Sequence, residues 1–138
     1  MEHGKPVATV TVVGESDAPR YVQKIHADKH ELLADEHVSL GGADAGPGPF
    51  AYVLSGLGAC TSITLRMYAE RKGWTLGTVT VRLQLFREET GIRVEREVAI
   101  GAALSDDQRA RIADICERTP VTLALKSGLG IRTTLKTA

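Results

Sequence analysis

Residues 46–73 read GPGPFAYVLSGLGACTSITLRMYAERKG, and this stretch decides the fold. Pro49 stands where proline is tolerated, in or just before a first helical turn. Arg71 and Lys72 suit the negative end of a helix dipole, and Gly73 suits the left-handed residue that ends a helix. The stretch therefore predicts a helix of about 24 residues, roughly 36 Å long.

This helix is apolar on nearly every side, because its large side chains leave little room for a solvent face before Arg66 and Glu70. A helix of this kind must be covered by other elements. The same two charged residues argue against a membrane-spanning helix, and residues 1–10 lack the apolar segment of a secretory signal. We therefore expect a cytoplasmic protein with no membrane partner.

The chain has 138 residues, of which 17 are basic and 17 acidic. Its length predicts a single domain, residues 1–138, with a core of its own. The balanced charge and the aromatic content of 4% argue against a nucleic-acid partner. Two cysteines without an export signal argue against a disulfide framework and leave redox chemistry open.

The segments before the long helix predict an antiparallel meander. Residues 7–13, 21–25 and 31–34 are rich in β-branched or apolar side chains, as strands are. Glycines and prolines gather in residues 35–48, which predicts a loop that leads into the helix.

After the helix, residues 79–87 and 92–100 alternate like the two half-buried strands of a hairpin. In the register that places Leu83 opposite Arg96, the other apolar positions of both strands share one face. Arg96 then lies on the apolar face. Either a bulge shifts the strand or a cation is held near the core.

The last third of the chain predicts two helices and a strand. Ser105 and Gln108 form a capping-box signature, so a helix should begin there. Pro120 breaks or redirects it, and residues 121–126 form another turn or two. Residues 131–135 predict a closing strand. The order of elements indicates an α+β domain in which helices pack against strongly curved antiparallel sheets.

Cys60 and Cys116 are the candidates for chemistry, and each lies on the apolar stripe of its own helix. One interpretation is a buried small hydrophobe, and the other is a reactive thiol. A reactive thiol needs partial access and an electropositive neighbour, and Arg66 lies on a different face from Cys60. If the two stripes meet, the thiols could form a redox couple. The histidines match no zinc-ligand spacing, so no metal site is expected.

Two segments resemble the OsmC/Ohr family of small thiol peroxidases: residues 46–68, which contain LGACT around Cys60, and Thr119-Pro120-Val121-Thr122. The order of elements agrees along nearly the whole chain. The resemblance implies an OsmC-like fold and an intertwined homodimer, in which a long central helix from each subunit packs between two curved antiparallel sheets. Such a dimer would explain a helix without a solvent face.

The resemblance also implies a reaction, the reduction of organic hydroperoxides in oxidative-stress defence. A reactive cysteine attacks the O–O bond and becomes a sulfenic acid, a second cysteine condenses with it, and an external dithiol or small thiol restores both. By this resemblance, Cys60 attacks the peroxide, and Cys116 is the second cysteine that condenses with the sulfenic acid. Arg20, from the N-terminal hairpin, holds the thiolate. No bound cofactor is implied, and the site is a cleft at the subunit interface with apolar walls.

The chain departs from the family pattern at two positions. The better-studied hydroperoxide reductases carry a glutamate directly after the proline that corresponds to Pro49, where this chain has Phe50. Their resolving cysteine occupies the position that corresponds to Thr119 in this chain. Cys116 lies one helical turn before that position, on roughly the same face. Two interpretations follow: a divergent peroxidase of low or narrow activity, or a catalytically weak protein that binds a small apolar ligand in the same cleft.

Overall fold

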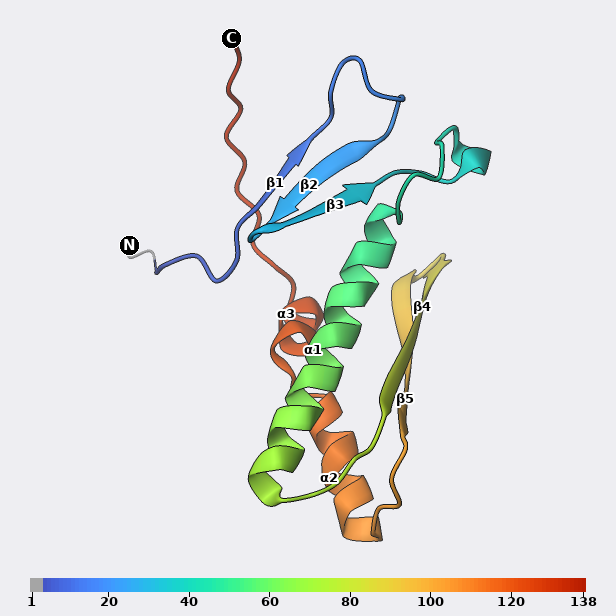
Figure 1. Cartoon of the computed structure of the whole chain (residues 1–138), viewed down its shortest axis with the longest axis vertical. Helices are drawn as coiled ribbons and strands as arrows, with labels where there is room; N and C mark the ends of the chain where they lie inside the picture. The colour runs from blue at the N-terminus through green and yellow to red at the C-terminus, as the bar shows by residue number, and fades with distance from the viewer. Residues whose placement is uncertain (1–3) are drawn as a thin grey trace. The chain divides into compact units, whose positions relative to one another are not determined.

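The computed structural model describes residues 4–138, which form three α-helices and two antiparallel sheets (Figure 1). The α+β class predicted from the sequence is therefore confirmed. The chain divides into two compact units, Met1–Val53 and Leu54–Ala138. Two compact units can belong to one domain, and the single domain over residues 1–138 stays a prediction.

The first unit contains the predicted meander. Its strands follow the order β1-β2-β3, and both neighbouring pairs are antiparallel. The strands are β1 (Val10–Val13), β2 (Gln23–Ala27) and β3 (His30–Ala34). The first strand is shorter than the predicted 7–13. A 3₁₀ turn, η1 (Val38–Leu40), lies in the loop after β3.

A buried carboxylate organises this glycine-rich loop. Asp35 is 2% exposed, and its oxygens accept the backbone N–H groups of Glu36 at 2.7 Å and of Ala43 and Ala45 at 3.0 Å. The N–H of Ala45 is the largest cause that holds the pKa of the Asp35 carboxyl below its usual value. Burial raises this pKa, whereas the N–H groups of Glu36 and Ala43 lower it further. The sequence predicted the loop but not the carboxylate that shapes it.

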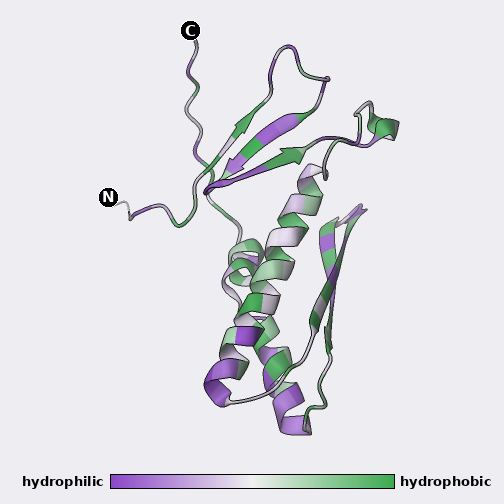
Figure 2. Cartoon of the chain, in the orientation of Figure 1, coloured by the Kyte–Doolittle hydropathy of each residue, from purple (hydrophilic) through white to green (hydrophobic). Residues whose placement is uncertain are grey.

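The long helix α1 spans Pro49–Lys72, 24 residues, as predicted. Its last turns are coloured as hydrophilic in Figure 2, whereas its middle is largely apolar. Gly73 follows with φ of 71°, and the N–H groups of Gly73 and Trp74 donate to the carbonyls of Glu70 and Ala69. This pair of bonds is the Schellman arrangement, which only a residue with free access to positive φ closes without strain.

The second unit contains the predicted hairpin of β4 (Val79–Glu88) and β5 (Gly91–Ile100). Leu83 pairs directly with Arg96 in an unbroken ladder, so there is no bulge between these strands. Of the two explanations that the sequence left open, a cation held near the core is the correct one.

Two further helices complete the second unit, α2 (Asp106–Cys116) and α3 (Pro120–Ser127). Both halves of the capping box at Ser105 are formed. The core joins one face of α1, the loop after it and the inner face of α2. Its buried members are Leu65, Ala69, Leu76, Ile112, Ile115 and Cys116.

The predicted closing strand over residues 131–135 is wrong. Residues 128–138 form no strand, and Ile131 and Leu135 are each 85% exposed. Alternating side chains make a strand only where a neighbouring strand takes up the backbone N–H and C=O groups. Within residues 4–138 no strand pairs with this segment.

The chain alone covers α1 on one side only. Leu57, Thr61 and Leu65 are buried, whereas Ile63 is 54% exposed and Met67 is 59% exposed. The homodimer that would cover the other side stays a prediction. None of the helices in residues 4–138 combines the length and the apolarity that crossing a bilayer requires.

Candidate functional site

Cys60 lies in the middle of α1 and is half-buried. Its Sγ accepts the backbone N–H of Val121 at 3.5 Å and lies 3.9 Å from the hydroxyl of Thr64. Val121 is the second residue of α3. The sulfur of Cys60 therefore lies against the N-terminus of a helix that is distant in the sequence.

The first turn of α3 leaves this N–H free for the sulfur. Pro120 occupies the first helical position and has no N–H to satisfy. Thr119 is the N-cap residue, but its side chain makes no capping hydrogen bond, and its hydroxyl lies 2.6 Å from that of Thr122. The thiol of Cys60 thus takes the place of the missing capping side chain.

This position suits a thiolate. The first N–H groups of a helix carry partial positive charge and stabilise an anion placed against them. Reactive cysteines occur at helix N-termini for this reason. Cys60 lies too far along α1 to profit from the dipole of its own helix, and α3 supplies the electropositive end instead.

Arg96 projects from β5 into the same region, with a side chain that is 12% exposed. Its Nη1 donates to the hydroxyls of Thr61 at 3.0 Å and Thr122 at 2.8 Å. Its Nη2 donates to the carbonyl of Cys116 at 2.8 Å and lies 3.6 Å from a carboxylate oxygen of Glu117. Both terminal nitrogens of the cation predicted near the core therefore have partners, and they link β5 to the three α-helices.

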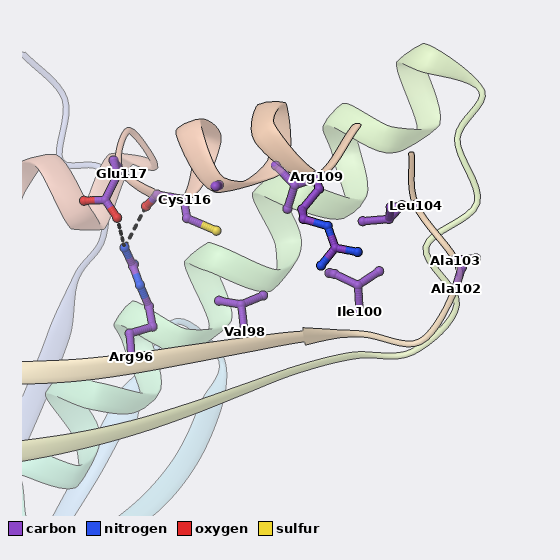
Figure 3. A pocket seen from close by; sticks show the side chains of 11 residues that line it. Arg96, Val98, Ile100, Ala102, Ala103, Leu104, Arg109, Cys116 and Glu117 are labelled. Atoms are coloured by element: carbon purple, nitrogen blue, oxygen red, sulfur yellow. Dashed lines mark hydrogen bonds and ion pairs between the residues drawn. The ribbon is translucent and has the colours of Figure 1, made fainter. Parts of the chain in front are cut away.

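Cys116 ends α2 and is buried at 7% exposure. Burial raises the pKa of its thiol; the charge of Arg96 opposes this effect, and that of Glu117 adds to it. In Figure 3 its side chain points into a cavity of about 410 Å³ that Val98 and Ile112 also line. The environment therefore favours the neutral thiol at Cys116.

The structure assigns different surroundings to the two cysteines. Both are free, the sulfur of Cys60 contacts the start of α3, and the side chain of Cys116 points into the cavity. Arg20 belongs to the first unit. There its Nη2 donates to the hydroxyl of Tyr21 at 2.7 Å, and its guanidinium lies 4.8 Å from the centre of that ring. The pairing of Arg20 with Cys60 stays a prediction.

Sequence reasoning missed the N–H of Val121 and the hydroxyls of Thr61 and Thr122 as parts of this site. Arg96 did leave a signal, since a charged residue on the apolar face of a strand needs buried partners. Within residues 4–138, no three histidine, cysteine or acidic side chains gather closely enough to hold a metal ion.

The sequence matches the family described as OsmC-like protein over residues 41–134. The chain belongs to this family. The matched range contains Cys60, Arg96 and Cys116 but not Arg20. No curated protein matches the chain.

Several solved structures have the same fold. An OsmC-like protein from Mycoplasma pneumoniae has a TM-score of 0.74 and 21% identity, with 89% of each chain covered. An organic hydroperoxide resistance protein OsmC from Legionella pneumophila has a TM-score of 0.65 and 18% identity, with 90% of this chain and 92% of that chain covered. A Vibrio cholerae structure with captopril bound in one of its active sites has a TM-score of 0.60 and 17% identity, with 91% of this chain and 89% of that chain covered.

Proposed function

We propose that the protein reduces organic hydroperoxides, with Cys60 as the residue that attacks the peroxide. Membership of the OsmC-like family, together with neighbours described as hydroperoxide resistance proteins, supports a stress-related peroxidase role. The observation that carries the assignment to Cys60 is the 3.5 Å hydrogen bond from the N–H of Val121 to its sulfur. A half-buried sulfur at a helix N-terminus has both the access and the electropositive neighbour that a reactive thiolate needs.

The reaction begins with the thiolate of Cys60. Its sulfur attacks one oxygen of the hydroperoxide, the O–O bond breaks, and the leaving alkoxide takes a proton to become an alcohol. The sulfur is oxidised to a sulfenic acid as the peroxide is reduced. A thiol then condenses with the sulfenic acid to form a disulfide and release water, and a second thiol reduces this disulfide and restores Cys60.

The source of the resolving thiol is a choice between Cys116 and an external small thiol or dithiol. Cys116 is buried in the core, and burial raises the pKa of its thiol, so little of it is thiolate. Attack on a sulfenic acid requires a thiolate. These features favour an external thiol as the reductant, with Cys116 as the alternative that the experiment below distinguishes.

The substrate class follows from a cavity beside the site. About 420 Å³ in volume, it lies between α1, β5 and α3. Its walls include the apolar side chains of Leu57, Val94 and Leu125 and the charged side chains of Arg96, Glu117 and Lys126. Leu57 lies one helical turn before Cys60, and Thr122, also in the wall, follows Val121. The apolar part of this lining favours an organic peroxide over hydrogen peroxide.

We propose a second copy of this chain as the partner. One side of α1 remains uncovered, with Ile63 54% exposed and Met67 59% exposed. Large apolar side chains gathered on one helix face indicate an interface. Sedimentation equilibrium should give the mass of a dimer, and Met67→Asp should give that of a monomer. A monomeric native protein would refute the dimer.

The experiment compares the protein with its Cys60→Ser and Cys116→Ser variants after a stoichiometric amount of cumene hydroperoxide. We expect a dimedone adduct on Cys60 in the native protein and in Cys116→Ser, and none in Cys60→Ser. Turnover with dihydrolipoamide should likewise survive only where Cys60 is present, and an Arg20→Met variant tests the predicted partner in the same assay. Equal peroxide consumption by native protein and Cys60→Ser would refute the proposal, and a Cys60–Cys116 disulfide would assign resolution to Cys116.

The second candidate function is binding of a small apolar ligand without turnover. Phe50 is the observation that favours it, because an apolar ring stands where the family reductases carry a carboxylate. Calorimetry with cumyl alcohol, which resembles the reduced substrate but cannot react, tests binding alone. Binding without any peroxide consumption would favour this function over the first.

A further inference from the structure

We infer that Arg96 is the positioning residue of the Cys60 site: it holds the first turn of α3 against α1 so that the N–H of Val121 reaches the sulfur. This inference rests on the proposed function, since it gives Arg96 a role in the reactivity of Cys60. Arg96 also lines the cavity of about 420 Å³, but the role inferred here is to position the two helices that meet at the sulfur.

The geometry of the hydrogen bonds carries the inference. A single nitrogen of Arg96, Nη1, donates to both Thr61 and Thr122. Thr61 directly follows Cys60 on α1, and Thr122 directly follows Val121 on α3. The same guanidinium nitrogen therefore binds the residue after Cys60 and the residue after Val121, on either side of the hydrogen bond to the sulfur. Moving α3 away from α1 at this point would therefore stretch these bonds as well as the contact with the sulfur.

The protons of this network balance. The hydroxyl of Thr61 donates to the carbonyl of Leu57 at 2.7 Å, so its oxygen is turned to accept from Arg96. The hydroxyls of Thr122 and Thr119 share one hydrogen bond, which leaves Thr122 a lone pair for the same nitrogen. Among residues 4–138 no buried side-chain nitrogen or oxygen lacks a partner. A satisfied polar network of this kind is rigid.

The second nitrogen fixes Arg96 itself. Nη2 donates to the carbonyl of Cys116 at the end of α2, and Glu117 lies beside it. The planar guanidinium presents its donors in a fixed fork, so an anchor on Nη2 also sets the direction of Nη1. Lysine has a single tetrahedral ammonium at its end and could not hold all three acceptors in this plane.

Stability alone gives no reason for this cation. A buried ion pair is often replaced by apolar residues without loss of stability, and Arg96 pairs with Leu83 on the apolar face of the hairpin. An apolar residue would fit the pattern of that face, but it would remove the hydrogen bonds that connect Thr61 on α1 with Thr122 on α3. The two threonines, one on each helix, are the partners that explain an arginine at this position.

The test measures the rate of alkylation of Cys60 by iodoacetamide from about pH 5 to about pH 9, in the Cys116→Ser background so that one thiol reacts. Arg96→Met removes the donors, and Arg96→Lys keeps the charge without the fork. Arg93→Met is the matched control, because Arg93 lies on the same strand but is exposed, where it pairs with Glu88 and Glu95 and lies over the ring of Phe86. Circular dichroism checks that each variant folds.

We expect Arg96→Met to slow alkylation near pH 6 by about tenfold and to move the whole rate profile to higher pH, as the loss of one hydrogen bond to a thiolate would. Arg96→Lys should lie between it and the native profile, and Arg93→Met should leave the profile unchanged. A purely structural role would lower stability without moving the profile. Identical profiles for folded Arg96→Met and Arg93→Met would overturn the inference.

If Arg96→Met does not fold, Thr122→Val decides, because it removes only the acceptor on α3. A profile that moves supports the inference, and one that stays overturns it. The outcome is separable from the proposed function, since alkylation needs no peroxide. A native protein without peroxide turnover whose profile moves in the variants would refute the peroxidase and leave the role of Arg96 intact.

Discussion

Replacing Thr122 by valine tests the energetics of the buried network at its centre. Thr122 is 4% exposed, and valine keeps its shape and its β-branched rotamer preference while it removes the hydroxyl. The hydroxyl accepts from Arg96 at 2.8 Å and shares a bond of 2.6 Å with Thr119. The substitution therefore removes a hydrogen-bond partner from an N–H of Arg96 and from the buried hydroxyl of Thr119.

The size of the effect follows from these two bonds. A hydrogen bond to a charged group contributes about 1.5–3 kcal/mol and a neutral one about 1 kcal/mol. The added methyl group is apolar and buried, which returns part of this loss. We expect Thr122→Val to lower the free energy of unfolding by about 2–4 kcal/mol.

Urea unfolding at fixed protein concentration measures this loss, since dimerisation would make the stability depend on concentration. Thr80→Val, an exposed site on β4, is the control and should change stability by less than about 0.5 kcal/mol. A double-mutant cycle with Arg96→Met should give a coupling of about 1.5–3 kcal/mol. A loss below about 0.5 kcal/mol for Thr122→Val, or strictly additive losses in the cycle, would refute the reasoning.

Three further predictions concern the scaffold. Because the folded state lowers the pKa of Asp35, its carboxylate stabilises the fold above the unfolded pKa of about 4, and this contribution is lost as the pH falls through the folded pKa. Asp35→Asn should therefore be less stable than the native protein in urea at about pH 7 and should approach it below about pH 4; a gap that is constant with pH would contradict this. Leu65→Ala at the fully buried centre of the core should lower the free energy of unfolding by about 2–5 kcal/mol, and a loss below about 1 kcal/mol would mean that the core is not packed as described. Gly73→Ala, at φ of 71°, should cost about 1–2 kcal/mol in the same assay, and an unchanged stability would contradict the left-handed helix end.

Elements whose signals are local could be predicted from the sequence. The caps and composition of α1, the capping box of α2 and the alternation of β4 and β5 each lie within a few residues, so each element could be assigned without knowledge of the fold. The hairpin register was also right, because it is the one that gathers the apolar positions on one face. The closing strand over residues 131–135 failed for the complementary reason, since a strand depends on a partner that its own sequence does not contain.

The resemblance of residues around Cys60 and Pro120 to the OsmC/Ohr family was confirmed by the match over residues 41–134. The roles of Cys60, Cys116 and Arg20 stay predictions. The sequence also identified Arg96 as a cation out of place on an apolar face. It could not name its partners, because they lie on three other elements.

The sequence by itself determined the helices, the hairpin and the family, since backbone propensity, apolar periodicity and capping act over short distances along the chain. Only the tertiary structure decided what surrounds the sulfur of Cys60. The donor at Val121 stands far from Cys60 in the sequence, and a hydrogen bond of this kind exists only after packing has brought α3 against α1. The identity of a neighbour in space is a property of the folded chain, because no local pattern records which helix end a given side chain will meet.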